Sequence, residues 1–174
     1  LLKVYFVQFK HAKINSQFGE ARNHLINGLQ ITPASQIFLA ELINLEIEDN
    51  KVTEAKKVLK RLEAIAPEAA PVYVLKSDVD NKESNPTLAL QYSTKAWGIS
   101  KTDSTGRTHY ENLNNSDKAA AADFLESWTK SSNNPHLPLQ LSGTHALLAG
   151  ENQKGIRYFK LALNLVPNDV TSLN

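Results

Sequence analysis

The feature that most constrains this chain is a 34-residue period in its small and apolar residues. Alanine recurs at Ala21, Ala55 and Ala89, three positions spaced by 34 residues. Each of the first two alanines is followed by leucine four positions later and by proline twelve positions later. A fixed period of this length is typical of structures that stack copies of one supersecondary unit. The chain is therefore predicted to be an array of such units.

The apolar spacing inside each copy is helical. In residues 52–65 the apolar side chains recur at steps of three and four, which places them on one face of a helix. The charged residues of the opposite face are Glu54, Lys57, Lys60 and Glu63. Residues 39–47 show the same apolar spacing, and no strand pattern of comparable length occurs. Each copy is thus predicted to be two antiparallel helices, with small residues at close contacts and proline turning the chain.

Composition excludes several classes of protein. Lysine and arginine number 19 and the acidic residues 18, so the formal charge of +1 gives no global signal for nucleic acid or an anionic membrane. Cysteine is absent, which excludes disulfides, thiolate catalysis and cysteine-based zinc sites. No stretch approaches the roughly 20 apolar residues that span a bilayer. We expect no nucleic-acid partner and no transmembrane segment in this chain.

The repeated unit resembles the tetratricopeptide repeat (TPR), a 34-residue helical hairpin that ends in proline. The final copy matches best, at Gly143, Ala146, Gly150, Phe159, Ala162 and Pro167. It departs mildly from the pattern at Gly155, where alanine is usual. The resemblance covers nearly the whole chain and implies an all-α fold, an α-solenoid of antiparallel helix-turn-helix repeats in a right-handed superhelix. It implies a scaffold that binds other proteins, but it does not indicate which partner is bound.

The period divides the chain, as a single solenoid segment, into five copies. Their expected ranges are 2–34, 35–68, 69–101, 102–135 and 136–169, with the start of a further helix at 170–174. The fourth copy is degenerate. Its second helix, 117–130, keeps the pattern, whereas 103–114 is polar and contains Gly106. We expect the first helix of this copy to be short or frayed.

A narrower resemblance concerns two stretches of the C-terminal half. Residues 117–128 and 150–167 look like long bacterial repeat proteins of cell-envelope systems, namely those of exopolysaccharide export and PEP-CTERM exosortase sorting. That resemblance implies a periplasmic or membrane-anchored scaffold, and without it the expectation is a cytoplasmic protein. An anchoring cysteine would lie upstream of these residues.

No constellation of residues predicts catalysis. The histidines are His11, His24, His109, His136 and His145, and no two are spaced as in a zinc-peptidase helix. Ser127 and Lys130 fit Ser-x-x-Lys by letter, but they lie on an amphipathic helix without the further motifs that such hydrolases need. No phosphate-binding glycine loop is present. We predict no catalytic, cofactor-binding or metal-binding residues, and hence no enzyme.

A partner-binding surface is predicted on the first helices of the copies, which line the concave face of such solenoids. The residues expected there are Phe6, Lys10, Asn44, Val74, Asp78, Tyr110 and Thr144. This mixed polar and apolar set suits a peptide or a helix of a partner protein, and ordinary solvated residues are an equally good interpretation. The set lacks the basic pattern with which some family members clamp a C-terminal carboxylate.

Two functions from different classes remain open. The first is a protein–protein interaction scaffold that binds a partner peptide or helix, as a fragment of a longer bacterial envelope TPR protein. The alternative is a regulatory or targeting TPR region of an enzyme whose catalytic domain lies outside this chain. The sequence predicts neither the partner nor the oligomeric state.

Overall fold

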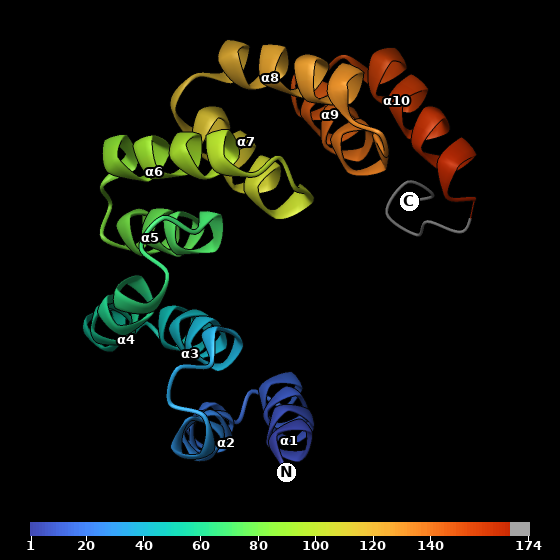
Figure 1. Ribbon diagram of the computed structural model, residues 1–174. Coiled ribbons are helices and arrows are strands. Elements are labelled where there is room, and N and C mark those ends of the chain that lie inside the picture. The colour runs from blue at the N-terminus through green and yellow to red at the C-terminus, as the bar shows by residue number, and fades with distance from the viewer. Residues whose placement is uncertain (168–174) are drawn as a thin grey trace. The chain divides into compact units, whose positions relative to one another are not determined.

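The computed structural model describes residues 1–167, and within them every regular element is an α-helix (Figure 1). The helices are α1 (Leu2–Ile14), α2 (Phe18–Ile31), α3 (Gln36–Glu48), α4 (Val52–Ile65), α5 (Ala70–Lys82), α6 (Pro86–Ile99), α7 (Asp103–Ser116), α8 (Lys118–Ser131), α9 (His136–Leu148) and α10 (Asn152–Leu165). They form consecutive hairpins, each with a first and a second helix. The further helix expected at 170–174 lies outside the described residues.

Four of the hairpins share one turn geometry. Their first helices end in three-residue turns whose central residue is left-handed: Ser16 (φ 57°), Asn50 (φ 58°), Ser84 (φ 61°) and Gly150 (φ 79°). The residue after the central one donates its N–H back to the last turn of the helix, at 2.7–2.9 Å. These are Schellman turns, which satisfy the last carbonyl groups of the helix and reverse the chain.

The fourth hairpin turns differently. Asp117 alone separates α7 from α8, and its carboxylate caps α8 by accepting from Ala119 N–H (2.9 Å) and Ala120 N–H (3.0 Å). Because this turn is two residues shorter than the others, Ala121 follows Ala89 by 32 residues instead of 34. Gly155 then follows Ala121 by 34. The period is thus interrupted once, at this turn.

The expectation of a short or frayed helix in 103–114 is wrong. Helix α7 has 14 residues, as long as any other helix in the described chain. Its start is held by reciprocal bonds, in which Thr102 N–H donates to Thr105 Oγ1 (3.0 Å) and Thr105 N–H donates to Thr102 Oγ1 (3.3 Å). These two bonds form a capping box in which threonine takes the place of the usual glutamate. Local capping therefore compensates for a segment that propensity disfavours.

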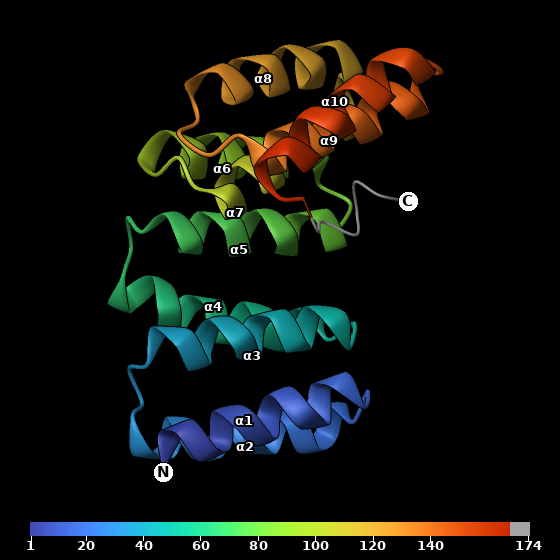
Figure 2. The ribbon, with the colours of Figure 1, turned by 90° about the vertical axis from the view of Figure 1, so that its right-hand side faces the viewer.

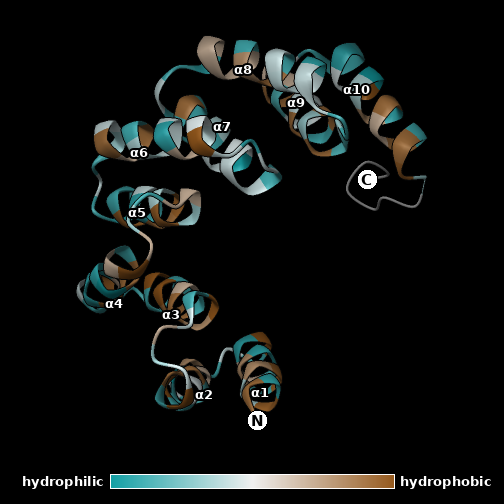
Figure 3. Cartoon of the chain, in the orientation of Figure 1, coloured by the Kyte–Doolittle hydropathy of each residue, from teal (hydrophilic) through white to brown (hydrophobic). Residues whose placement is uncertain are grey.

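The chain divides into two compact units, residues 1–108 and 109–174. In the first unit the hairpins α1–α2, α3–α4 and α5–α6 follow one another as tiers (Figure 2). Helix α2 packs on α3, α4 packs on α5, and α3 also touches α5. The largest fully buried side chains in this unit are Phe9, Leu25, Leu39, Ile43 and Leu45. Figure 3 shows the strongly hydrophobic character of α3.

Small residues permit the closest helix contacts. A Cβ added at Gly28 would lie 2.1 Å from the Phe38 ring, and one at Gly143 would lie 2.8 Å from the Phe159 ring. A Cβ at Gly155 would come within 2.7 Å of Leu147. The glycine that replaces the usual alanine thus has a physical reason, since α9 and α10 pack against each other across it.

In the second unit α8 packs on α9, and α9 on α10. Leu125, Trp128 and Ala146 are buried there. Nowhere in residues 1–167 is there a helix with the length and hydropathy required to cross a bilayer.

Candidate partner-binding surface

The first helices of unit 1 carry five of the seven residues predicted to bind a partner. Two ion pairs join α1 to α3: Lys10 Nζ lies 2.7 Å from Glu41 Oε1, and Lys13 Nζ lies 2.7 Å from Glu48 Oε1. Both pairs are partly exposed, so each contributes at most about 1 kcal/mol to stability. Their effect is mainly to fix the positions of charges on this face.

Lys10, one of the predicted residues, is already engaged inside the chain. Its ammonium group is 5.1 Å from the ring centroids of both Phe6 and Phe9 and is paired with Glu41. The predicted Phe6 also packs against Phe38, at 5.8 Å between ring centroids. Lys10 and Phe6 therefore form one cluster at the junction of α1 and α3.

Asn44 and Asp78 lie at one groove. This groove of about 460 Å³ is lined by Asn44, Ile47, Glu48, Asp78, Asn81 and Lys82, from the C-terminal halves of α3 and α5. Its lining combines amide, carboxylate and ammonium groups with one aliphatic side chain, that of Ile47. Such a lining can bind the polar backbone of a peptide together with one apolar side chain. Val74, one turn before Asp78 on α5, is half-buried.

The remaining two predicted residues belong to the second unit. Tyr110 is only 6 % exposed, and its hydroxyl lies 3.3 Å from Nδ1 of His145. Burial raises the pKa of the Tyr110 phenol above its ordinary value. Thr144 is exposed and donates its hydroxyl hydrogen to the Gln140 carbonyl (3.2 Å). The predicted set is thus divided between the two units, five residues in one and two in the other.

Sequence reasoning missed an apolar groove on the same first-helix surface. It has a volume of about 370 Å³ and is lined by Leu2, Lys3, Phe6, Val7, Ile37 and Phe38. Only Phe6 was predicted. The available signal was the presence of Val7 and Ile37, two aliphatic residues that lie off the buried stripe of their helices.

The other notable cluster lies on α4, α5 and α6. The ammonium of Lys76 is paired with Glu63 and lies 5.4 Å and 5.3 Å from the ring centroids of Tyr73 and Tyr92. A shallow groove of about 300 Å³ adjoins it. Because the cationic group is already neutralised and covered by rings, this cluster is explained as packing between hairpins.

A charge network also joins α2 to the end of α3. The Arg22 guanidinium donates to both carboxylate oxygens of Glu46 (2.6 and 2.8 Å) and to Asp49 (2.6 Å). The hydrogen bond with Glu46 is the main reason that the Arg22 pKa is raised, and Lys51 with Arg22 lowers the Asp49 pKa. Glu46 is 3 % exposed and would be costly to leave unpaired. This network holds the first two hairpins together.

Two of the residues considered for chemistry, Lys130 and His109, make ordinary surface and packing contacts. Lys130 Nζ lies on Glu126 (2.5 Å), one helical turn away, as expected for a surface pair. His109 packs edge-on against Phe124, at 4.8 Å between centroids. No group of three histidine, aspartate or glutamate side chains in residues 1–167 could hold a metal ion.

No family model and no curated protein matches the sequence. Solved structures match the fold. TTC0263, a TPR protein of Thermus thermophilus, superposes with a TM-score of 0.76 at 13% identity, over 99% of this chain and 95% of that one. The chain has the fold of TPR proteins.

Two further structures with this fold are informative. YrrB, described as a TPR protein with an unusual peptide-binding site, has a TM-score of 0.58 at 15% identity, covering 97% of this chain and 88% of its own. The Thermobaculum terrenum O-GlcNAc transferase has a TM-score of 0.64 at 18% identity, over 77% of this chain and 26% of that enzyme. At these identities the likeness concerns the TPR fold alone.

Proposed function

We propose that this chain is a protein–protein interaction scaffold that binds a peptide or helix of a partner on its first helices. The observation that carries the proposal is the groove between α3 and α5, whose lining includes Asn44, Asp78 and Ile47. Its volume is in the range of small-ligand and side-chain sites. The peptide-binding site described for YrrB, which shares the fold, supports the proposal.

The test is selection from a displayed library of random peptides, followed by binding measurements on variants. Asn44→Ala combined with Asp78→Ala is expected to weaken the selected peptides at least about tenfold, because groups that would bind the peptide backbone are lost. The matched control combines Glu54→Ala with Lys57→Ala, an exposed pair on α4. Both double variants should keep the helicity of the wild type. If both then lose binding equally, or if neither loses it, this site is refuted. Adding Lys10→Ala extends the test to the rest of the predicted set.

We further propose that the scaffold works in a bacterial envelope system of the exopolysaccharide or exosortase type. The proposal is based on the sequence of residues 117–128 and 150–167. Fractionation of the source cells tests this. Recovery with periplasm or membranes is expected, and recovery with cytoplasm alone would contradict it.

A TPR region attached to an enzyme is the second candidate. The observation in its favour is the fold shared with O-GlcNAc transferase, of which the matched part is about a quarter. The two candidates can be distinguished by determining the full length of the protein purified from its source cell. Intact mass and peptide mapping that place a catalytic domain on the same polypeptide would favour the regulatory region.

A further inference from the structure

The apolar groove between the N-terminal halves of α1 and α3 is exposed, and one of its aromatic lining residues is fixed by packing against other rings. Val7 and Ile37 at its walls are 66 % and 65 % exposed. The Phe6 ring, which also lines the groove, packs on Phe9 and Phe38 at 5.8 Å between centroids in each case. The core of unit 1 is therefore closed without Val7 and Ile37, and their apolar surface is available to another molecule.

The length of the groove limits what it can hold. Towards the C-terminal ends of the same helices, the Lys10–Glu41 and Lys13–Glu48 pairs bridge α1 to α3. The apolar part runs along α1 from Leu2 to Val7, about 8 Å at 1.5 Å per residue. That length fits two apolar side chains spaced by one turn of a helix.

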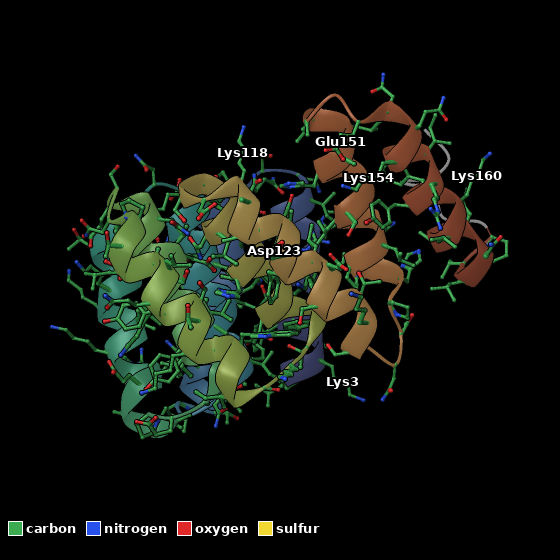
Figure 4. All side chains as sticks on the ribbon, turned by 90° about the horizontal axis from the view of Figure 1, so that it is seen from above. Lys3, Lys118, Asp123, Glu151, Lys154 and Lys160 are labelled. Atoms are coloured by element: carbon green, nitrogen blue, oxygen red, sulfur yellow. The ribbon has the colours of Figure 1, made fainter. Side chains whose placement is uncertain are left out.

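Among the residues that line the groove, the charged one is Lys3. Lys3 lines it and has no ion-pair partner among residues 1–167. Figure 4 shows the Lys3 side chain extending outward from its helix. Helix α1 carries three lysines and no acidic residue, and its other two lysines, Lys10 and Lys13, are paired with glutamates of α3. Helix α3 has no side-chain cap at its N-terminus, so its first N–H groups add to the positive potential.

We propose that this groove binds an acidic amphipathic helix of a partner protein, which inserts two apolar side chains one turn apart and places a carboxylate beside Lys3. The proposal rests on the proposed scaffold function and names the class of partner at the Phe6 end of that surface. A helix is the natural occupant because α2 on α3 and α4 on α5 already cover first helices in the same way. The acidic character follows from Lys3.

The test uses the chain and two synthetic helical peptides with one leucine stripe, flanked in one peptide by glutamate and in the other by lysine. Fluorescence anisotropy is expected to show binding of the glutamate peptide. Val7→Glu and Ile37→Glu should each weaken it at least about tenfold, because a carboxylate then occupies the apolar wall. Lys3→Glu should weaken the glutamate peptide and strengthen the lysine peptide. All three positions are exposed, so the fold should be unchanged by circular dichroism.

The matched control is Ile14→Glu, which changes an even more exposed aliphatic residue (82 %) at the far end of α1. It should bind the glutamate peptide as the wild type does. Equal binding of both peptides, or equal loss in the control, overturns the proposal. So does binding of phosphatidylserine vesicles in place of the peptide, or a Val7-dependent dimer in sedimentation. If the Asn44 and Asp78 variant loses binding of library peptides while Val7→Glu and Ile37→Glu leave binding of the glutamate peptide unchanged, this inference is overturned. The scaffold function would still stand.

Discussion

Single residues in this chain are constrained most strongly where two helices almost touch. At Gly28 the hydrogen side chain leaves room for the Phe38 ring, whose atoms would otherwise lie within 2.1–2.9 Å of a Cβ. Neither side can give way easily, because both residues are buried. Glycine therefore fits this position sterically, although it is less favourable than alanine inside a helix.

Gly28→Ala is therefore expected to lower the free energy of unfolding by about 1–3 kcal/mol, the usual cost of overpacking. Urea unfolding measures the change. Gly98→Ala is the control, since a Cβ there meets nothing within 4 Å. That variant should be neutral or gain up to about 1 kcal/mol from helix propensity. A Gly28 variant as stable as the Gly98 variant would show that the Phe38 contact is not tight.

His109 predicts a dependence of stability on pH. Burial lowers the pKa of this imidazole below its usual 6.5 in the folded chain. As the pH falls below about 6.5 the unfolded state binds more protons than the native state, so the free energy of unfolding should decrease. Above that pH the contribution is fully present.

Urea titrations at several pH values between about 5 and 7.5 measure this slope. His109→Gln is expected to flatten it in the acidic range. His11→Gln, at an exposed histidine of α1, should keep the wild-type slope. If His109→Gln changed the midpoint but left the slope intact, another group would be responsible for the pH dependence.

At the scale of elements, the sequence predicted most of the helices and underestimated the length and order of one, α7. Alternating small and large residues at a 34-residue period specify where two helices meet, so α2, α4 and α10 follow from positions such as Ala21 and Ala55. Helix α7 has no such pattern. It forms because Thr102 and Thr105 cap it, which is hydrogen-bond chemistry that hydrophobic periodicity does not report.

The one-residue turn before α8 makes a prediction at the same scale. Asp117→Ala should cost about 1 kcal/mol of stability, because two N–H groups of the first turn lose their acceptor. Thermal unfolding with Asp123→Ala as control checks this, since Asp123 is exposed on the same helix (Figure 4). Equal effects of the two substitutions would mean that the cap contributes nothing beyond charge.

The candidate surface was predictable only in part. Asn44 and Asp78 are 34 residues apart, so the period alone places them at equivalent positions of neighbouring first helices, and the groove contains both. The period does not report depth or pairing. Lys10 bonds to Glu41, which has no counterpart one period later because Leu75 stands there. The exposure of Val7 and Ile37 likewise depends on tertiary packing.

At the scale of the whole molecule, we propose that the first helices bind a partner while the second helices pack against neighbouring hairpins. In unit 1 the first helices carry the two grooves and the ion pairs between α1 and α3. The second helices α2 and α4 instead cover the next hairpin. The distribution of roles repeats with the hairpins, so a partner should contact several of them at once.

Hydrogen–deuterium exchange with a library-selected peptide tests this division most directly. Bound peptide is expected to slow amide exchange in the first helices of unit 1, at the C-terminal turns of α3 and α5 that contain Asn44 and Asp78. Exchange in α2 and α4 should change less. Protection confined to α2, α4 and α6, with none in α3 or α5, would contradict the assignment of binding to the first helices.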